Sequence, residues 1–358
     1  MFDSPQHWLG STPRCPVADT LGIGIIGMGF IGQIHARAFR DAARDGLPCA
    51  IRAVSDPDPD RRSGLASDAG NLGAGGEADR LFDPAAVALS DDPEELLADG
   101  GVDLVCVCTP TDTHVDLAIR ALDAGKHVLV EKPIATSNAE VRRLFERAAT
   151  ADRRCIPAMC VRFWPGWSDL REIVEDGRFG DVLHARFERL GSPPAWSSDF
   201  YADSNRSGNA VFDLHVHDAD FVHHLLGRPR AVHSRGDDRH IVTQCDYDRI
   251  SSVTIEGGWL NDASFPFRMA YSVEFERAVV TFDSRLEHPM HIHAAGAHST
   301  PDIGSGTGFE QQARTICAVL LGGTSAAVLP TVAEALTVTE FIEAERESAS
   351  QNRLIELS

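Results

Sequence analysis

The apolar positions of the first 160 residues follow two alternating patterns. Short continuous apolar runs, such as LGIGII at 21–26 and VDLVCVC at 102–108, are typical of strands buried on both faces. Between such runs lie segments such as THVDLAIRALDAGK at 113–126, whose apolar residues recur every three or four positions and predict amphipathic helices. Strands that alternate with helices predict a doubly wound parallel sheet, in which ligands lie at the carboxyl ends of the strands.

The pattern changes near residue 160. A predicted helix at 166–180 and a predicted strand at 181–191 are followed by an apolar, histidine-rich helix at 210–227. The strand-like runs after this helix have no helices between them, which predicts an antiparallel sheet. The segment 331–349 is a good helix former, and we expect it to pack back onto a sheet.

These patterns predict an α/β chain of two domains. A Rossmann domain with a doubly wound parallel sheet should span 21–160, and a second α/β domain with an open, mostly antiparallel sheet should span 161–358. Residues 1–20 contain three prolines and show no clear periodicity. We expect a disordered tail there; an ordered arm lying on a neighbouring subunit is the alternative.

A glycine-rich turn follows the first apolar run. Its sequence fits G-x-G-x-x-G, with a predicted strand before it and the helical segment QIHARAFRDAAR after it. Gly27 allows the tight turn, Gly29 lets the backbone approach a pyrophosphate, and Gly32 lets the helix pack against its strand. The positive end of the helix dipole would then face the phosphates. The turn therefore predicts a dinucleotide site; a glycine-rich turn of some other α/β domain is the alternative.

The second predicted strand, CAIRAVSD, ends on Asp56. A carboxylate at this place accepts hydrogen bonds from the adenosine ribose hydroxyls of NAD and repels the 2′-phosphate of NADP. Arg61 and Arg62 lie downstream, and their positive charges would partly offset this preference by attracting a 2′-phosphate. The acidic strand end predicts NAD rather than NADP.

Two further strand ends should lie beside the glycine turn, at Thr109-Pro110 and Glu131-Lys132-Pro133. Lysine is scarce in this chain, which contains only Lys126 and Lys132. A lysine at a strand end beside the cofactor can hydrogen-bond a substrate hydroxyl and stabilise negative charge on it. We therefore interpret Lys132 as catalytic; an ordinary solvated lysine is the alternative.

The histidine-rich helix offers an acid–base pair. Asp213 and His217 are four residues apart, so they share one helix face, and a nearby aspartate can fix the tautomer of a histidine. His217 and Asp220 fit almost as well, and spacing does not decide between the two pairs. Histidines also recur at 215, 223–224 and 288–293, but the chain has no HExxH motif and no cysteine cluster at zinc spacing, so we expect no metal site.

Composition argues against several other functions. With 53 acidic against 33 basic side chains and a net charge of −20, the chain lacks the basic face of nucleic-acid or anionic-membrane binding proteins. Its apolar runs are too short to span a bilayer, and the first 20 residues lack the features of a signal peptide. The eight cysteines are scattered without a CxxC pair, which favours a reducing, cytoplasmic location.

Together these motifs resemble the Gfo/Idh/MocA oxidoreductases, a family that includes glucose-fructose oxidoreductase and inositol dehydrogenase. The similar stretches are IGIIGMGFIGQIHARAF, CTPTDTHVDLAIRALDAGKHVLVEKPIA, RFWPGWSDLREIVEDGRFGDV and SGNAVFDLHVHDADFVHHLLG, and they span most of 21–227. The block T-P-x-x-x-H…A-G-K-H-V-x-x-E-K-P is highly specific. The resemblance implies an NAD(P)-dependent dehydrogenase that transfers a hydride between a secondary alcohol of a sugar, inositol or related polyol and the nicotinamide.

The resemblance also implies residue roles. Lys132 would contact the reacting hydroxyl, and Asp213 with His217 would form the proton relay, which resolves the choice that spacing leaves open. The cofactor contacts it implies are Gly27, Met28, Gly29, Phe30, Ile31, Gly32, Asp56, Thr109, Pro110, His114, Glu131 and Lys132. Two departures add side chains near the expected substrate pocket: His215 stands where the family often has glycine, and the usual glycine run is reduced to Ser207-Gly208-Asn209.

Substrate contacts are expected from side chains that suit a polyol or sugar. These are Arg162, Trp164, Trp196, Tyr201 and His215; for the two tryptophans, core or dimer packing is the alternative. A homodimer or homotetramer built through the C-terminal sheet is the expected assembly. Two other functions fit the same fold: a glycosidase that uses a retained NAD transiently, and a non-catalytic cofactor-sensing regulator. A regulator would be expected to lose the lysine or the histidine that this chain keeps.

Overall fold

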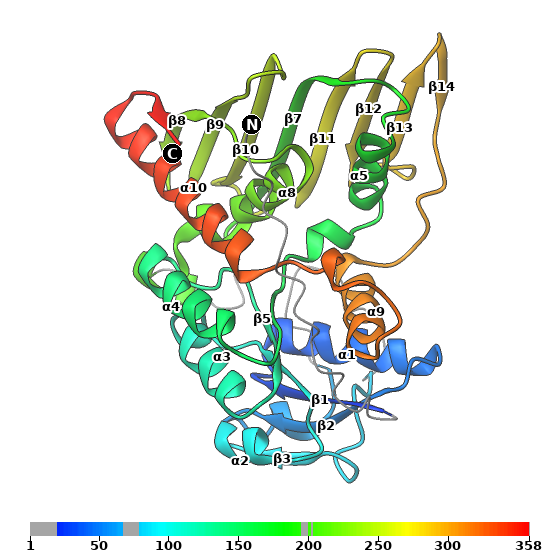
Figure 1. Cartoon of the computed structure of the whole chain (residues 1–358), viewed down its shortest axis with the longest axis vertical. Helices are drawn as coiled ribbons and strands as arrows, with labels where there is room; N and C mark the ends of the chain where they lie inside the picture. Colours follow the sequence, from blue (N-terminus) through cyan, green and yellow to red (C-terminus); the bar gives the residue numbers. More distant parts are fainter. Residues whose placement is uncertain (1–19, 67–78, 195–199, 202, 358) are drawn as a thin grey trace, which may run out of the picture.

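The computed structural model describes residues 20–66, 79–194, 200–201 and 203–357. These residues form two sheets, placed one above the other in Figure 1, and helices pack against both. Trp196 and residues 1–19 of the expected tail lie outside the described residues, so the predictions made for them are not addressed by the structure.

The lower sheet has six parallel strands in the order β3-β2-β1-β4-β5-β6. Its strands are β1 (Leu21–Ile26), β2 (Cys49–Ser55), β3 (Ala88–Ser90), β4 (Leu104–Val107), β5 (His127–Val130) and β6 (Cys155–Pro157). Every residue of β1 and β4 is buried, which explains why both runs are continuously apolar. The strand order reverses between β1 and β4, where doubly wound sheets bind their ligands.

Helices join these strands. They are α1 (Phe30–Arg44), α2 (Pro93–Ala98), α3 (His114–Asp123) and α4 (Asn138–Ala149), with the short 3-10 turns η1 (Arg61–Ser63) and η2 (Thr111–Thr113). Asp92 and Ser137 cap the N-termini of α2 and α4, since their side chains accept hydrogen bonds from the first-turn amides of Glu94 and Glu140. These caps account for where the two helices begin.

The upper sheet has nine strands in the order β14-β13-β12-β11-β7-β10-β9-β8-β15. They are β7 (Val182–Gly191), β8 (Ala231–Asp237), β9 (His240–Asp246), β10 (Ser252–Trp259), β11 (Arg268–Phe275), β12 (Ala278–Asp283), β13 (Met290–Ala294), β14 (Ala297–Ser299) and β15 (Ile355–Glu356). Neighbouring strands pair antiparallel except β7 and β10, which run parallel and end together at Gly191 and Trp259. Side chains such as Phe187, Ile255 and Val273 are buried on one face, whereas their sequence neighbours are more exposed on the other.

Helices cover one face of the upper sheet and lie in front of it in Figure 1. They are α5 (Trp167–Asp176), α8 (Val216–Leu226) and α10 (Val332–Gln351); the other helical segments are η3 (Cys160–Phe163), α7 (Ser204–Ser207), the π-helix η4 (Val211–His215), α9 (Gly308–Leu320) and η5 (Ala326–Val328). Helix α9 packs on α1, and α10 contacts both α4 and α8. The second half of the chain therefore contacts the first through both helices, and α10 also reaches α8.

The predicted fold class is confirmed, with one parallel sheet and one open, mostly antiparallel sheet. The apolar stretch RCIPAMCVRF at 154–163 has the composition of a single strand, but only its first part forms one, because β6 ends at Pro157 and a 3-10 turn begins at Cys160. The predicted helix at 210–227 forms as η4 followed by α8. Apolar spacing does not separate a π-turn from an α-helix, because the two differ by only one residue in each backbone ring.

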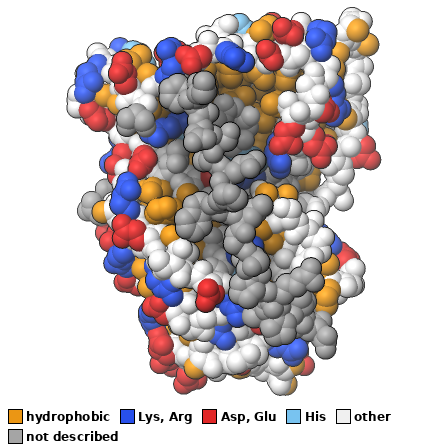
Figure 2. Space-filling view, in the orientation of Figure 1, with side chains coloured by type: hydrophobic (Ala, Val, Ile, Leu, Met, Phe, Trp, Pro, Cys, Tyr) orange, Lys and Arg blue, Asp and Glu red, His pale blue; other side chains and the backbone are white. Residues whose placement is uncertain are grey.

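The molecular surface agrees with the acidic composition. On the face shown in Figure 2, Asp and Glu side chains are interspersed with Lys and Arg, and no broad basic patch is visible there. Of the helices in the described ranges, none combines the length and the apolar character needed to cross a membrane.

Candidate active site

Four segments meet at the carboxyl edge of the six-stranded sheet. The amide of Gly27 donates to the carbonyl of Ser55 at 2.8 Å, and the amide of Cys108 donates to the carbonyl of Ile26 at 2.8 Å. The amide of Glu131 donates to Val107 at 3.1 Å, which brings in the end of β5. The turns after β1, β2, β4 and β5 therefore lie side by side, as the parallel pattern predicts.

The glycine turn leaves room for a phosphate. Gly27 has φ +91°, and a Cβ at Gly32 would lie 1.9 Å from the carbonyl oxygen of Gly27, so both places require glycine. Among the described residues, the atom nearest to a Cβ at Gly29 would be the Arg61 guanidinium nitrogen at 3.9 Å. The N-cap residue of α1 is Gly29, so among the described residues the N-cap position supplies no capping side chain. An open backbone at an uncapped helix N-terminus fits a bound pyrophosphate, with Phe30 and Ile31 in the first turn.

Asp56 lies beside this turn and is buried. Its Oδ2 accepts the amide of Met28 at 2.7 Å, and its Oδ1 accepts the amide of Asp58 at 2.9 Å. The Arg61 guanidinium lies 3.9 Å from Oδ2. Each carboxylate oxygen keeps a second lone pair, so the arrangement fits acceptance of ribose hydroxyls while fixing the carboxylate in place.

His114 and Glu131, both expected at the cofactor, bind other parts of the protein. The His114 ring nitrogens lie 2.8 Å from the carbonyl of Thr109 and 2.9 Å from that of Pro133, and burial lowers the pKa of His114. Glu131 Oε1 lies 2.6 Å from His35 Nε2, and Oε2 accepts the amide of Lys132 at 3.0 Å. The two side chains therefore shape the loops around the Thr109-Pro110 and Lys132 backbones.

Lys132 reaches from the end of β5 to the second half of the chain. Its ammonium donates to the carbonyl oxygen of Asp213 at 2.8 Å and to Asp213 Oδ1 at 3.2 Å. Both side chains are 16% exposed. This contact brings the sequence-predicted lysine and aspartate together, although they are 81 residues apart.

His217 lies one turn after Asp213, at the start of α8. Within the described residues no hydrogen bond joins Asp213 to His217, and His217 Nδ1 is buried without a partner. Burial holds the pKa of His217 well below its usual value, and the nearby cations Lys132 and Arg189 lower it further. The imidazole is therefore neutral and can accept a proton. Asp213 orients Lys132 in this structure rather than the histidine.

Three buried ion pairs fix the helix that carries these residues. The carboxylate of Asp218 accepts a hydrogen bond from Arg189 Nε at 2.6 Å, and that of Asp220 accepts two from the Arg162 guanidinium at 2.8 and 2.6 Å. His215 Nε2 lies 2.8 and 3.0 Å from the two oxygens of Glu345. Because Asp220 is bound to Arg162, the alternative pairing of Asp220 with His217 does not form.

Arg162 and His215 do not occupy the places expected of substrate contacts. Arg162 is buried and also binds Glu334 at 2.7 Å, and His215 is fully buried against Glu345. A side chain enclosed in this way presents no polar atom to a substrate. We therefore remove both from the set of expected substrate contacts and interpret them as part of the framework.

The aromatic candidates differ from one another. Trp164 makes an edge contact with Phe309 of α9, with ring centroids 6.1 Å apart, which supports the packing alternative. Tyr201 packs edge-on against Trp259, with centroids 5.7 Å apart. Burial raises the pKa of Tyr201, and the negative charges of Asp213 and Glu131 raise it further, so this phenol lies near both carboxylates. Sequence reasoning missed Trp259, because nothing in the local sequence separates it from a core residue.

In the parts of the chain that the structure describes, no group of three or more histidine, cysteine, aspartate or glutamate side chains has an arrangement that could hold a metal ion. The histidines at 291, 293 and 298 stack on one another at the edge of the upper sheet.

Comparison with known proteins agrees with this geometry. Residues 21–159 match the family model described as "Oxidoreductase family, NAD-binding Rossmann fold", and residues 167–276 match the "GFO/IDH/MocA C-terminal domain". The chain belongs to the Gfo/Idh/MocA family. The resemblance inferred from the sequence motifs is therefore confirmed, and so is an NAD-binding Rossmann domain in the first half of the chain.

Named members of the Gfo/Idh/MocA family are similar over different shares of their length. An inositol 2-dehydrogenase from Rhizobium meliloti (strain 1021) is 30% identical over 298 residues, which cover 81% of this chain and 80% of that protein. The scyllo-inositol 2-dehydrogenase (NAD(+)) of Bacillus subtilis (strain 168) is 35% identical over 140 residues, 38% of this chain and 39% of that protein. A solved structure of levoglucosan dehydrogenase with NADH and levoglucosan has a TM-score of 0.78 at 18% identity, over 94% of this chain and 99% of that one, which shows a shared fold.

The electrostatics of this Gfo/Idh/MocA site predict how His217 titrates. Replacing Lys132 by methionine removes one of the cations near the imidazole, so the charged form becomes less unfavourable and the pKa of His217 should rise toward its usual value. Imidazole NMR shifts followed against pH measure this, with the signal assigned from its loss in His217→Gln. Arg147→Met removes a partly exposed cation on α4, paired with Asp123, and should leave the titration unchanged. An unchanged pKa in Lys132→Met would contradict the prediction.

Proposed function

We propose that this Gfo/Idh/MocA chain is an NAD(H)-dependent dehydrogenase that oxidises a secondary alcohol of a cyclitol or sugar. The observation that carries the proposal is the contact of the Lys132 ammonium with Asp213, beside the glycine turn and one helical turn before His217. The names of the relatives, inositol 2-dehydrogenases and a levoglucosan dehydrogenase, support the substrate class.

In the proposed reaction His217 accepts the proton of the alcohol. Its neutral imidazole is prepared for this, because burial and nearby cations disfavour the protonated form before substrate arrives. Lys132 donates a hydrogen bond to the same oxygen and stabilises the charge that develops on it. Asp213 orients the Lys132 ammonium. NAD, held by the glycine turn and Asp56, supplies the hydride acceptor when it is bound.

The proposed substrate side of the site includes Tyr201 and Trp259. Their edge-to-face rings offer an apolar wall, and aromatic faces suit the C–H face of a hydroxylated ring. Trp259 Nε1 is buried without a hydrogen-bond partner in the described structure, so the indole N–H is available as a donor to a hydroxyl.

We further propose NAD as the preferred cofactor over NADP. Asp56 is the buried anion beside the glycine turn, and its position is fixed by the amides of Met28 and Asp58. A 2′-phosphate would place a second negative charge against it. Arg61 lies within 3.9 Å and is exposed, so it reduces this repulsion without removing it.

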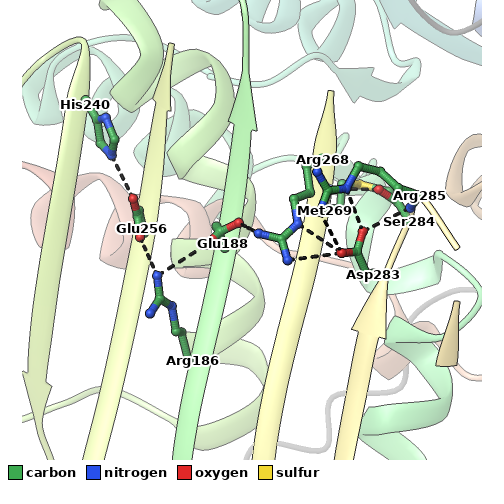
Figure 3. Close-up of polar contacts among 9 residues, drawn as sticks. All are labelled: Arg186, Glu188, His240, Glu256, Arg268, Met269, Asp283, Ser284 and Arg285. Carbon is green, nitrogen blue, oxygen red and sulfur yellow. Dashed lines mark hydrogen bonds and ion pairs between the residues drawn. The ribbon is translucent and has the colours of Figure 1, made fainter. Parts of the chain in front are cut away.

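A homodimer or homotetramer through the nine-stranded sheet is the proposed assembly. Its face opposite the helices carries a chain of charged groups across five strands, shown in Figure 3. Arg186 lies between Glu256 at 2.8 Å and Glu188 at 3.3 Å, and Arg268 joins Glu188 to Asp283. Alternating charges of this kind can pair with the same surface of a second copy. The seven cysteines that the structure describes are all free and buried, which supports our proposal of a cytoplasmic location.

A screen of inositols, aldoses and nucleotide sugars with NAD and NADP tests the proposed function. We expect net reduction of NAD at 340 nm with at least one of them, and kcat/KM about tenfold or more lower with NADP because of the charge at Asp56. Release of an aglycone from a glycoside without net NADH would instead identify a glycosidase. NADH binding without any turnover would favour a regulator.

The role of Lys132 predicts the effect of its removal. Lys132→Ala should lower kcat by about 10²- to 10³-fold, because one preorganised donor to the reacting oxygen is lost, while the Kd of NADH changes little. Arg147→Ala, at an exposed ion pair with Asp123, should keep wild-type turnover. Turnover unchanged in Lys132→Ala would remove the lysine from the mechanism.

Charge reversal tests the proposed assembly. Arg186→Glu places three carboxylates together on the open face and should shift the mass measured by sedimentation or light scattering toward the monomer. Arg147→Glu reverses a charge on α4, away from that face, and should keep the wild-type mass. A wild-type monomer, or an unchanged oligomer in Arg186→Glu, would show that the sheet is not the contact surface.

A further inference from the structure

The residue between the two catalytic groups of the helix has a partner far away in the sequence. His215 follows Asp213 by two residues and precedes His217 by two, and it ends the π-helix η4. Its Nε2 lies 2.8 and 3.0 Å from the carboxylate oxygens of Glu345, 130 residues later on α10. Both side chains are completely buried. The contact therefore joins the catalytic segment to the C-terminal helix inside the protein.

The opposite side of His215 is closed by strand β10. A Cβ added to Gly257 would lie 2.6 Å from the Cβ of His215 and 2.8 Å from its Nδ1. Any side chain at that position would displace the imidazole, so the strand approaches it at backbone distance. His215 is thus held between β10 and α10, which leaves η4 little freedom to shift.

Helix α10 is in turn attached to the NAD-binding half. The carboxylate of Glu343 accepts the amide of Asn138 at 3.0 Å, and Glu340 binds Arg142 at 2.8 Å, both on α4. Near its start, Glu334 binds Arg162 at 2.7 Å. One rigid helix therefore contacts the domain that presents Lys132 and the segment that presents Asp213 and His217.

We propose that Glu345, acting through His215, is a positioning residue that sets Asp213 and His217 relative to Lys132. Burying an ion pair carries a large desolvation cost, and well-packed apolar residues in its place often leave the protein equally stable or more stable. Such a pair between Asp213 and His217 is explained if the orientation of these two side chains matters, because a hydrogen-bonded pair fixes the backbone that carries them. A misplacement of about 1 Å in a catalytic group can lower the rate by about 10²-fold. The proposal rests on the proposed dehydrogenase function.

The test compares Glu345→Gln and His215→Gln with Glu340→Gln in the full-length protein. Glu340→Gln weakens the attachment of α10 to α4 at a partly exposed pair and does not touch His215. For Glu345→Gln we expect kcat about tenfold or more below wild type, with the Kd of NADH within about twofold. The double variant Glu345→Gln/His215→Gln should be no slower than the slower single variant, because the two residues act as one unit.

Three outcomes would overturn the proposal. The first is a kcat of Glu345→Gln within about twofold of wild type, and the second is a double variant whose loss of activation free energy is the sum of the two single losses. The third is a fall in kcat accompanied by weaker NADH binding and a lower Tm, since this would indicate a general loss of structure. If Glu345→Gln does not fold, the same criteria apply to His215→Gln. Absence of turnover in the wild type with every substrate would instead refute the dehydrogenase function. In that case ¹³C-methylation of the two lysines gives a readout without substrate: the Lys132 signal should shift in Glu345→Gln while that of Lys126 stays in place.

Discussion

The Lys132 ammonium donates to both the backbone carbonyl and the carboxylate of Asp213, and this one pair of hydrogen bonds joins the two halves of the chain at the proposed catalytic site. The lysine belongs to the strand edge that forms the dinucleotide site, whereas the aspartate belongs to the helix above it. Neither half holds all three groups that we propose for catalysis. The chemistry therefore depends on how accurately the two halves are held together, and much of the remaining structure serves that requirement.

Buried charge is the means by which the helix is held. Three side chains of the helical segment pair with residues of three different elements: Asp218 with Arg189, Asp220 with Arg162, and His215 with Glu345. His217 lies between them, and no described residue is a partner of its Nδ1. The contrast has a physical basis: a paired ion can be buried, but a lone imidazole in the same surroundings loses its charge. The framework pairs thus fix the helix, and the unpaired histidine is kept neutral.

The sequence allowed accurate prediction where a local rule governs the structure. The glycine turn, Asp56 and Lys132 each follow a buried strand, and the edge of a parallel sheet brings strand ends together whatever lies between them. The prediction failed for Arg162 and His215, whose partners on α10 come 172 and 130 residues later. A local sequence with an arginine near aromatic residues fits a sugar-binding site and a buried ion pair equally well. Only the fold distinguishes the two, and the same is true of Trp259.

The buried ion pairs of the helix bear on how such an enzyme can be altered. Moved into another Rossmann protein, residues 211–226 would carry Asp218, Asp220 and His215 without their partners Arg189, Arg162 and Glu345, leaving uncompensated charge in an apolar interior. The segment is therefore not a portable module, and its motif has meaning only together with three distant partners. Redesign of substrate choice has more freedom at Tyr201 and Trp259, whose contact is aromatic packing. The residues proposed for catalysis and those proposed for substrate choice thus occupy parts of this molecule with very different tolerance to change.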